Sequence, residues 1–365
     1  MVMEHYIGIM SGTSLDGIDA VLVATDGRRI ELKGSASAPI ASALRERLLA
    51  LAGGDAITAK EWGELDVALG QAYAEVTLQL LASTGMSAEQ VRAIGCHGQT
   101  VWHQPDAELP FSLQLGDGNR LAALSGITTV TDFRRKDMAL GGQGAPLVPA
   151  FHQCVLSHPE RLRILVNIGG IANISVLEPG RPVQGYDVGP GNMLMDAWCR
   201  RHTGATFDKD AALGRQGRVL PELLSRLLSE PWLGLPAPKS TGRELFNAAW
   251  LDARLNGDEA MADVQATLAE FTASAIAQQA QGFAAGELLV CGGGGHNPLL
   301  MARLHALLPG WRVATTSAAG VDMDAMEAMA FAWLAHQTLH HLPGNLPEAT
   351  GARRPAVLGA IHFPD

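Results

Sequence analysis

Apolar and polar positions along this chain form short apolar runs separated by longer stretches with helical spacing. Residues 6–10 and 18–23 are apolar and flank a segment of Ser, Thr, Gly and Asp, a pattern that predicts a strand, a tight turn and a second strand. Strand and helix patterns then alternate, with strands expected at 28–38 and 127–132 and helices at 41–51, 59–81 and 119–125. Residues 92–103 read as a short apolar strand that ends in a polar cluster, and residues 111–120 alternate into a turn. This alternation predicts an α/β fold.

The second part of the chain repeats this pattern without repeating its residues. Residues 163–177 again read as apolar strand, glycine-containing turn and apolar strand, and residues 183–188 supply a third strand. Further helices are expected at 193–202, 221–229 and 263–283, from 298 and from 321, with a strand at 287–291. We therefore expect two related domains, divided at the glycine-rich stretch 138–146: domain I from residues 1–135 plus 342–365, and domain II from residues 136–341.

Composition narrows the class of partner. The formal net charge of −10 and the pI near 5.6 argue against nucleic acid, because affinity for a phosphate backbone requires clustered Lys and Arg. The four cysteines form no C-x-x-C pair, and no segment approaches the ~20 apolar residues of a membrane span. No basic and apolar leader is evident at the N-terminus. We expect a cytoplasmic protein that acts on a small molecule and contacts neither nucleic acid nor membrane.

The first turn carries the chemistry of an anion site. Gly12 and Gly17 let backbone N–H groups point into one concavity, which binds phosphate, and Thr13 and Ser14 add hydroxyl donors. Asp16 beside such a site suggests a magnesium ion bound through water, since magnesium accepts both carboxylate and phosphate oxygens. The alternative for this segment is an ordinary hairpin with Asp-Gly turn chemistry.

Three further glycine-rich turns follow the first. They are NIGGIAN at 167–173, YDVGPGN at 186–192 and CGGGGHN at 291–297, so that Asp187 precedes a Gly/Pro turn and Asn297 lies near a helix N-cap. Four glycines between a strand and a helix bring the backbone close to a flat or anionic ligand.

These turns in this order resemble the sugar-kinase, acetate-kinase and actin-like ATPase superfamily. With CHGQTVWH, FRRKDMALGGQGAPLVP, KSTGRELF and the helix of Glu327, the chain resembles the bacterial anhydro-N-acetylmuramic acid kinases over nearly its whole length. The resemblance implies two related actin-like ATPase (ribonuclease H-like) domains with the active site in the cleft between them. It also implies a homodimer, the commonest soluble oligomer.

The activity implied by the resemblance is ATP-dependent phosphorylation of 1,6-anhydro-N-acetylmuramic acid at the 6-oxygen with hydrolytic opening of the anhydro ring. The product is N-acetylmuramic acid 6-phosphate, formed in peptidoglycan recycling, and the family's general base corresponds to Asp187. An inverting cleavage needs one carboxylate to activate water and an acid for the departing oxygen. Here the γ-phosphoryl group of ATP takes the place of that acid, and backbone N–H groups near Asp187 are expected to keep it ionised.

The resemblance also assigns binding roles. ATP and Mg²⁺ are expected to contact Gly12, Thr13, Ser14, Leu15, Asp16, Gly17, Ile18, Asp19, Asn167, Gly170, Gly292, Gly293, Gly294 and Asn297, with Asp16 near the metal. The sugar is expected to contact His97, Gln99, Arg134, Asp137 and Glu327, and the planar fork of Arg134 suits the lactyl carboxylate.

Several alternatives stay open from the sequence. Arg134 can instead cover surface beside Asp137, and Glu327 can be an ordinary solvated helix position. His336, His340 and His341 suggest a metal tract, but histidines also suit a helix C-terminus. Two rival functions are a kinase of the same fold acting on another sugar or a carboxylate, and an actin-like assembly protein.

Overall fold

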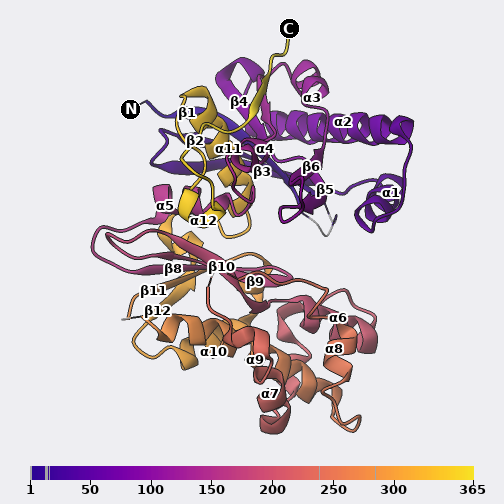
Figure 1. The fold of residues 1–365 in the computed structure, drawn as a ribbon, viewed down its shortest axis with the longest axis vertical. Coiled ribbons are helices and arrows are strands. Elements are labelled where there is room, and N and C mark those ends of the chain that lie inside the picture. Colours follow the sequence, from indigo (N-terminus) through magenta and orange to yellow (C-terminus); the bar gives the residue numbers. More distant parts are fainter. Residues whose placement is uncertain (1, 13–14, 16, 238, 284) are drawn as a thin grey trace. The chain divides into compact units, whose positions relative to one another are not determined.

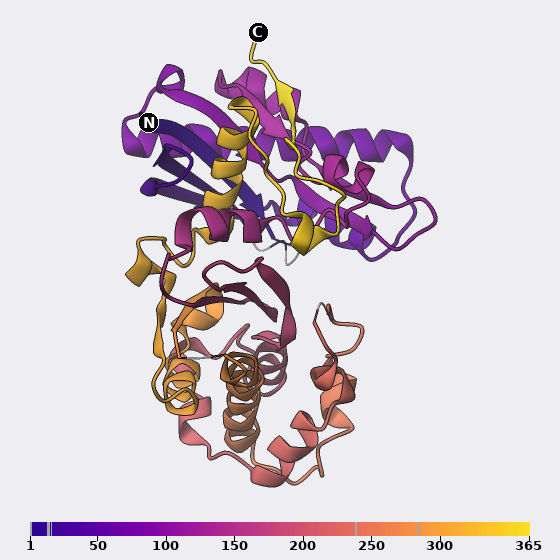
Figure 2. The ribbon, with the colours of Figure 1, turned by 60° about the vertical axis from the view of Figure 1, so that its left-hand side comes forward.

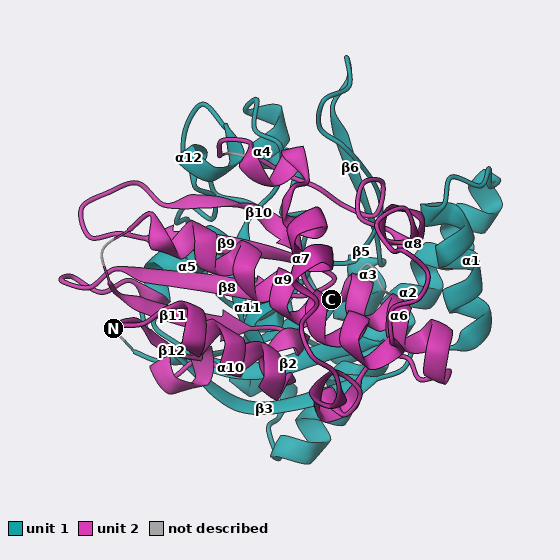
Figure 3. Cartoon of the chain, turned by 90° about the horizontal axis from the view of Figure 1, so that it is seen from below, with its two compact units in different colours: residues 1–155, 325–365 teal, residues 156–324 magenta. Residues whose placement is uncertain are grey.

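The structure is a computed structural model that describes residues 2–12, 15, 17–237, 239–283 and 285–365. The chain divides into two compact units: unit 1 is residues 1–155 and 325–365, and unit 2 is residues 156–324 (Figure 3). Each unit is described by itself below.

Unit 1 contains the strands and helices from both ends of the chain (Figure 1). Its strands are β1 (Glu4–Ser11), β2 (Ile18–Thr25), β3 (Ile30–Ala38), β4 (Val91–Cys96), β5 (Gln99–Gln104), β6 (Phe111–Leu115), β7 (Thr129–Thr131) and β13 (Ala360–His362). Its helices are α1 (Ser42–Ala52), α2 (Ala59–Thr84), α3 (Gly118–Ser125), α4 (Arg135–Ala139), α5 (Val148–Leu156, whose last residue belongs to unit 2), α11 (Met326–Leu339), α12 (Pro347–Thr350) and the 3₁₀ helix Ala88–Gln90.

The main sheet of unit 1 has the order β13-β7-β4-β1-β2-β3. β1, β2 and β3 pair antiparallel, whereas β4 pairs parallel with both β1 and β7. β5 and β6 form a separate two-stranded sheet.

Helices cover both faces of this sheet, and the alternation of residues along β1 explains how. Ile7 and Ile9 are fully buried in a core shared with Leu65, Leu69 and Tyr73 of α2. Gly8 points to the opposite face, where an added Cβ would overlap the carbonyl of Ala328 in α11. Glycine at this position therefore lets the backbone of α11 lie directly on the sheet.

Unit 2 is built from the middle of the chain (Figure 2). Its strands are β8 (Arg163–Ile168), β9 (Ile171–Leu177), β10 (Gln184–Pro190), β11 (Glu287–Cys291) and β12 (Arg312–Thr315). Its helices are α6 (Met193–Thr203), α7 (Pro221–Leu228), α8 (Ala248–Asp252), α9 (Met261–Gln281), α10 (Pro298–Leu307) and the 3₁₀ helices Lys209–Ala211, Gly214–Gln216, Pro231–Gly234, Gly293–His296 and Thr316–Ala319.

The sheet of unit 2 has the order β10-β9-β8-β11-β12, with antiparallel pairs β8–β9 and β9–β10 and parallel pairs β8–β11 and β11–β12. Numbered within each sheet, the sheet of unit 2 has the order 3-2-1-4-5, and the main sheet of unit 1 has the order 3-2-1-4-5-6, with the same directions for the five shared strands. The sixth strand of unit 1, β13, pairs antiparallel with β7. The predicted fold class, two related α/β halves, is confirmed by this shared order.

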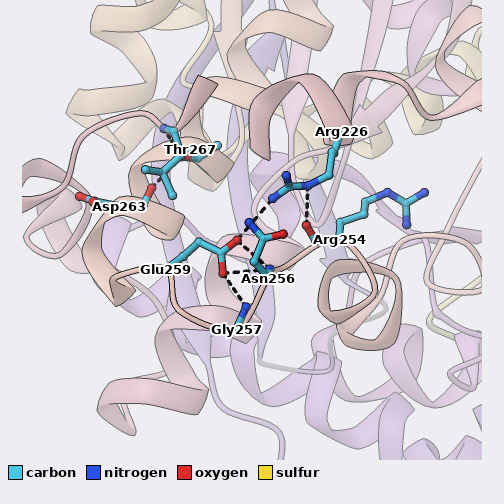
Figure 4. Close-up of polar contacts among 8 residues, drawn as sticks. Arg226, Arg254, Asn256, Gly257, Glu259, Asp263 and Thr267 are labelled. Atoms are coloured by element: carbon cyan, nitrogen blue, oxygen red, sulfur yellow. Dashed lines mark hydrogen bonds and ion pairs between the residues drawn. The ribbon is translucent and has the colours of Figure 1, made fainter. Parts of the chain in front are cut away.

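Helix α9 forms much of the core of unit 2, and a hydrogen-bonded turn directly precedes its first residue. Glu259 accepts hydrogen bonds from the backbone N–H groups of Asn256 and Gly257 at 2.8–3.1 Å, and it pairs with Arg226 at 3.4 Å (Figure 4). The helix then buries Val264, Leu268 and Phe271 with other apolar residues of the same core. These contacts fix the helix that packs beside β10, the strand of Asp187.

The unit boundaries differ from the predicted boundaries at 135/136 and 341/342. Helix α11 follows unit 2 in sequence but packs on β1 and β4, and Trp333 Nε1 donates to the carbonyl of Gly27 at 2.8 Å. The Sγ of Cys154, in α5, donates to the same carbonyl at 2.8 Å. Because they pack on the first sheet, α11 and all of α5 except its last residue belong to unit 1.

Local predictions were accurate for most elements, with a few exceptions. The last long helix begins at Met326 and not near residue 321, because the preceding residues form a turn in which the carbonyl of Met323 accepts from the N–H of Gly292 at 3.0 Å. The sequence did not indicate the helices α4, α5, α8 and α12 or the strands β5, β12 and β13. Within the described part of the chain, no helix is both long and apolar enough to cross a bilayer.

Candidate active site

The turn between β1 and β2 is the first of the predicted ligand sites. Thr13, Ser14 and Asp16 lie outside the described residues, so the predictions for them stay predictions. Leu15 is described: its N–H donates to the carbonyl of Gly12 at 3.1 Å and its φ is 56°. Arg45 Nε of α1 donates to the carbonyl of Leu15 at 2.9 Å. Leu15 is thus held by Gly12 and by Arg45, a residue that sequence reasoning missed.

Ile18, which begins β2, is buried, whereas Asp19 is exposed. The negative charge of Asp19 raises the pKa of Glu327 in α11. A carboxylate at the start of β2 and one near the start of α11 therefore lie in the same region of unit 1.

Arg134 and His97 form a bonded pair in unit 1. Arg134 donates to Nε2 of His97 from Nε at 3.2 Å and from Nη2 at 2.7 Å, and its Nη1 donates to the carbonyl of Gly144 at 2.8 Å. Burial first, and then the charge of Arg134, lower the pKa of His97 well below its usual value. His97 is therefore a neutral acceptor that orients the guanidinium, and Arg134 is not a solvated surface residue.

Glu327 supplies the charge that opposes Arg134. Burial raises the pKa of Glu327, and the attraction of Arg134 acts against this increase. Burial likewise lowers the pKa of Arg134 to about 10, and the charge of Glu327 counteracts it. Asp19, Arg134 and Glu327 are thus electrostatically coupled, as charges drawn from three elements of unit 1.

Gln99 carries an unsatisfied group beside this network. Its side chain is 1% exposed, its Nε2 donates to the carbonyl of Thr100 at 3.2 Å, and its Oε1 has no hydrogen-bond partner among the described residues. A buried amide oxygen without a partner costs free energy, so Gln99 Oε1 is available to a ligand that donates a hydrogen bond.

Asp137 is fully buried, and its carboxylate is already occupied. Its Oδ1 accepts from Asn345 Nδ2 at 2.6 Å and from Thr350 Oγ1 at 2.8 Å, and its Oδ2 accepts from the N–H of Gly144 at 2.9 Å. The carbonyl of Gly144 also accepts a hydrogen bond from Arg134. Asp137 therefore helps to position Arg134 through Gly144, and its bonds favour this role over direct contact with a ligand.

Asp187 is the central side chain of the candidate site in unit 2. It lies in β10, the edge strand, next to a register shift between Asp187 and Gly189. Its N–H donates to the carbonyl of Lys239 at 3.0 Å, and its Oδ2 accepts from the N–H of Thr241 at 2.9 Å. Lys239 and Thr241 of the segment KSTGRELF therefore lie against β10 and hold this carboxylate in place.

The environment of Asp187 differs from the expected one. Burial dominates and raises the pKa of Asp187 to about 6, the hydrogen bond from Thr241 lowers it, and the charge of Glu244 raises it. The hydrogen bond from Thr241 does not offset the loss of water, so the pKa lies above the usual value of an aspartate; with a pKa of about 6, Asp187 is still ionised at neutral pH. Thr241 Oγ1 is buried and has no hydrogen-bond partner among the described residues.

The glycine turns of unit 2 bind one another through backbone groups. The carbonyl of Gly170 accepts from the N–H groups of Gly191 and Met193, at 2.8 and 3.2 Å, and the carbonyl of Gly169 accepts from the N–H of Asn192 at 2.7 Å. The structure therefore brings together the turns NIGGIAN and YDVGPGN, which begin at residues 167 and 186.

Gly292 to Gly294 lie against the end of β8. Gly292 has a φ of 77°, and a Cβ there would overlap Oδ1 of Asn167; a Cβ on Gly294 would overlap the side chain of Ile168. Gly293 and Gly294 lie in a 3₁₀ turn. Asn167, Gly170 and the 292–294 turn are thus assembled at one end of the sheet of unit 2.

Asn297 has a local structural role. As the N-cap of α10, its Oδ1 accepts from the N–H groups of Leu299 and Leu300 at 3.1 and 3.0 Å. This capping bond agrees with the predicted position and already uses the side-chain oxygen.

Comparison with known proteins identifies the family. The family model described as anhydro-N-acetylmuramic acid kinase matches residues 4–364. A protein of that name from Vibrio parahaemolyticus is 58% identical over 98% of both chains, and one from Vibrio cholerae is 56% identical over 99% of both. Among solved structures, component A of (R)-2-hydroxyglutaryl-CoA dehydratase from Acidaminococcus fermentans aligns with a TM-score of 0.49 and 13% identity, covering 90% of this chain and 96% of the other. The chain belongs to the anhydro-N-acetylmuramic acid kinase family.

Proposed function

We propose that this chain transfers the γ-phosphoryl group of ATP to the 6-oxygen of 1,6-anhydro-N-acetylmuramic acid and adds water at the anomeric carbon. The family membership supports the substrate, and the observation that carries the chemistry is Asp187, a carboxylate whose pKa is raised to about 6. A base with a pKa just below neutral is largely ionised at pH 7 and still holds a proton well, which is the optimum for general base catalysis.

Asp187 is the base for the water molecule. Its carboxylate takes one proton as the water oxygen bonds to the anomeric carbon, and the bond from that carbon to the 6-oxygen breaks. The 6-oxygen bonds to the γ-phosphorus as the bond from phosphorus to the β,γ-bridging oxygen breaks, which releases ADP. Thr241 Oγ1, on the residue that binds Asp187, is available to orient the water.

Arg134 is the proposed partner of the lactyl carboxylate. Of its five N–H groups, three donate to His97 and Gly144, which leaves one N–H on each terminal nitrogen. Two such groups match the two oxygens of a carboxylate. Gln99 Oε1 is the acceptor that unit 1 offers to an amide or hydroxyl of the sugar.

Mg²⁺ fits the oxygen donors of unit 1. The negative charges of Asp19 and Glu327 repel each other, and a divalent cation between them would relieve this repulsion. These two carboxylates would bind the ion, and Asp16, which lies outside the described residues, is the third proposed ligand. When bound, Mg²⁺ would neutralise negative charge on phosphate oxygens. The expected homodimer and cytoplasmic location remain proposals, and analytical ultracentrifugation of the purified chain tests the first of them.

One incubation tests the proposed reaction. The purified chain is mixed with ATP, MgCl₂ and 1,6-anhydro-N-acetylmuramic acid in ¹⁸O-labelled water, and the sugar product is examined by mass spectrometry. The expected product is a sugar phosphate with one heavy oxygen at the anomeric carbon. Sugar phosphate without heavy oxygen would indicate a plain kinase, and ATP hydrolysis independent of sugar would contradict the proposal.

A further inference from the structure

Unit 1 contains a cluster of metal-ligating side chains that the proposed reaction does not use. Glu4 lies at the start of β1, and His336 and His340 lie in and directly after the last turns of α11. Among the described residues, these three form a group whose ligand atoms all lie within 4.8 Å of one another. Glu4 is 332 positions before His336, so only the packing of α11 on β1 creates the cluster.

The two histidines have the spacing of a metal-binding helix. Residues at i and i+4 lie one above the other on the same helix face, and a His pair at this spacing supplies two nitrogen ligands in metalloenzymes. Here the two rings stack, with centroids 4.2 Å apart and planes at 27°. Both rings therefore lie on the side of α11 that meets the start of β1.

The tautomer of His336 is set by its neighbour. The amide orientation of Gln337 is fixed because its Nε2 donates to the carbonyl of Pro343 at 3.1 Å. Its Oε1 then faces Nδ1 of His336 at 3.1 Å, so that Nδ1 carries the hydrogen and donates. This leaves a lone pair on Nε2, the arrangement in which an outer hydrogen bond prepares a histidine for a metal ion.

Glu4 is held from two other elements. Tyr6 OH donates to Oε2 at 2.9 Å, and Arg92 of β4 pairs with Oε1 at 3.4 Å. His340 Nε2 contacts the same Oε2 at 2.7 Å. The carboxylate is thus fixed in place, and its contact with His340 is the interaction that an ion would replace.

We propose that Glu4, His336 and His340 form a binding site for a divalent transition-metal ion of the zinc class. Such an ion takes histidine nitrogen and carboxylate oxygen at about 2.0–2.2 Å in tetrahedral geometry, so small rotations of side chains already within 4.8 Å suffice. The side chains of His340 and Glu4 are 43% and 24% exposed, which gives the ion a path from solvent and leaves its fourth position to water.

The ion would join the first strand of unit 1 to its last long helix. A metal that binds the folded chain and not the unfolded chain stabilises the fold, and the stabilisation grows with the logarithm of the free metal concentration once that exceeds the Kd. The alternative is that His340 and Glu4 form only an ion pair at the helix C-terminus, where a protonated histidine is favourable.

The test uses the full chain without a histidine tag. Titration with Co²⁺ is followed by visible absorption, and titration with Zn²⁺ by calorimetry. We expect one equivalent of either ion, visible bands of the intensity typical of four-coordinate Co²⁺, and a Tm that rises with Zn²⁺ concentration. In His340→Ala and Glu4→Gln, both at surface-accessible positions, affinity falls at least tenfold and the rise in Tm disappears.

A matched control is His341→Asn. His341 is exposed and adjacent but outside the cluster, and its φ of 53° is tolerated by Asn. This variant should bind like the parent chain. His340→Cys should restore binding and add a thiolate-to-Co²⁺ charge-transfer band, which only direct ligation produces. Absence of binding at one equivalent, or equal binding by the parent, His340→Ala and Glu4→Gln, would overturn the site.

Discussion

The sheets of units 1 and 2 share the order and direction of five strands, yet the candidate site of unit 1 consists mainly of side chains and that of unit 2 mainly of backbone turns. In unit 1 the site consists of interacting side chains: His97 accepts hydrogen bonds from Arg134, and the negative charge of Glu327 balances the positive charge of Arg134. Unit 2 uses backbone turns bonded through Gly169 and Gly170, with Asp187 as its one predicted catalytic side chain.

The difference shows that topology fixes where a site can form and the side chains fix its chemistry. In a network, each member supports the others, so a substitution in unit 1 should affect stability and activity together. Asp187 receives few bonds and is raised in pKa by burial, so a substitution there should affect activity alone.

The largest effect is expected for Asp187→Asn. Loss of a general base reduces turnover by about 10²–10⁴-fold, while Asn still accepts the hydrogen bond from Thr241. Because burial raises the pKa of Asp187, the ionised carboxylate costs stability above pH 6, so Tm at pH 8 should be unchanged or higher in the variant. Steady-state kinetics and calorimetry measure both quantities.

Asp252→Asn is the control for this variant, because Asp252 is a surface carboxylate of unit 2 paired with Arg201. It should retain full activity. If Asp187→Asn retained more than a tenth of the parent rate, unit 2 would not supply the base and the comparison would fail.

Arg134→Met is expected to have the next largest effect. A charge-assisted hydrogen bond to a substrate carboxylate contributes about 1.5–3 kcal/mol, or roughly 10–150-fold in kcat/KM. The variant also leaves Glu327 without its opposing charge and His97 and Gly144 without donors, so the free energy of unfolding should fall by about 1–3 kcal/mol.

Arg135→Met is its matched control, since Arg135 is exposed and pairs with Asp132 at 2.6 Å. It should change neither kcat/KM nor the denaturant midpoint appreciably. Loss of activity in Arg134→Met with unchanged stability would contradict the view that the site of unit 1 is a mutually supporting network.

Gly95→Ala tests the packing beneath that network. A Cβ at Gly95 of β4 would overlap the carbonyl of Phe331, so α11 must shift and carry Glu327 with it. Overpacking of this kind costs about 1–3 kcal/mol, measured by urea unfolding. Gly63→Ala, in α2 with open space around it, should instead raise stability by about 0.5–1 kcal/mol. Equal effects for both variants would mean that α11 tolerates displacement.

The smallest expected effect concerns pH. The active form of Asp187 is ionised, so kcat/KM should be constant above its pKa of about 6 and fall tenfold per pH unit below it. Glu244→Gln removes a negative charge that raises this pKa, and the acidic limb should move to lower pH by a few tenths of a unit. A shift in the opposite direction would show that Glu244 acts through another group.

Much of the fold was predictable because its signals are local. The strands on either side of the 12–17 and 169–170 turns, the helix 59–81 and the N-cap at Asn297 follow from apolar spacing and turn chemistry within a few residues. β12 and α5 were missed because their apolar runs are short and their identity depends on the neighbours that pair with or cover them.

The sequence predicted which residue types belong to the candidate site better than it predicted what each residue does there. The sequence pointed to Asp187, Arg134 and Glu327 as site residues, and to Asp137, which shares a motif with Arg134. The carboxylate of Asp137, however, accepts hydrogen bonds from Asn345 and Thr350, more than two hundred positions away. No pattern in the sequence around Asp137 predicts hydrogen-bond partners that are so remote in the chain. Thr241 lies within the motif KSTGRELF, yet its bond to Asp187 depends on how residues 239–241 pack against β10.

The sequence by itself determined the family, the paired hairpins and the chemical type of the candidate residues, because glycine turns and strand periodicity act over short distances. Tertiary structure decided which of these residues share a neighbourhood, how far burial shifts the pKa of Asp187, and that Glu4 meets His336 and His340. Electrostatic environment and ligand geometry depend on distances in space, and packing between segments remote in sequence sets those distances.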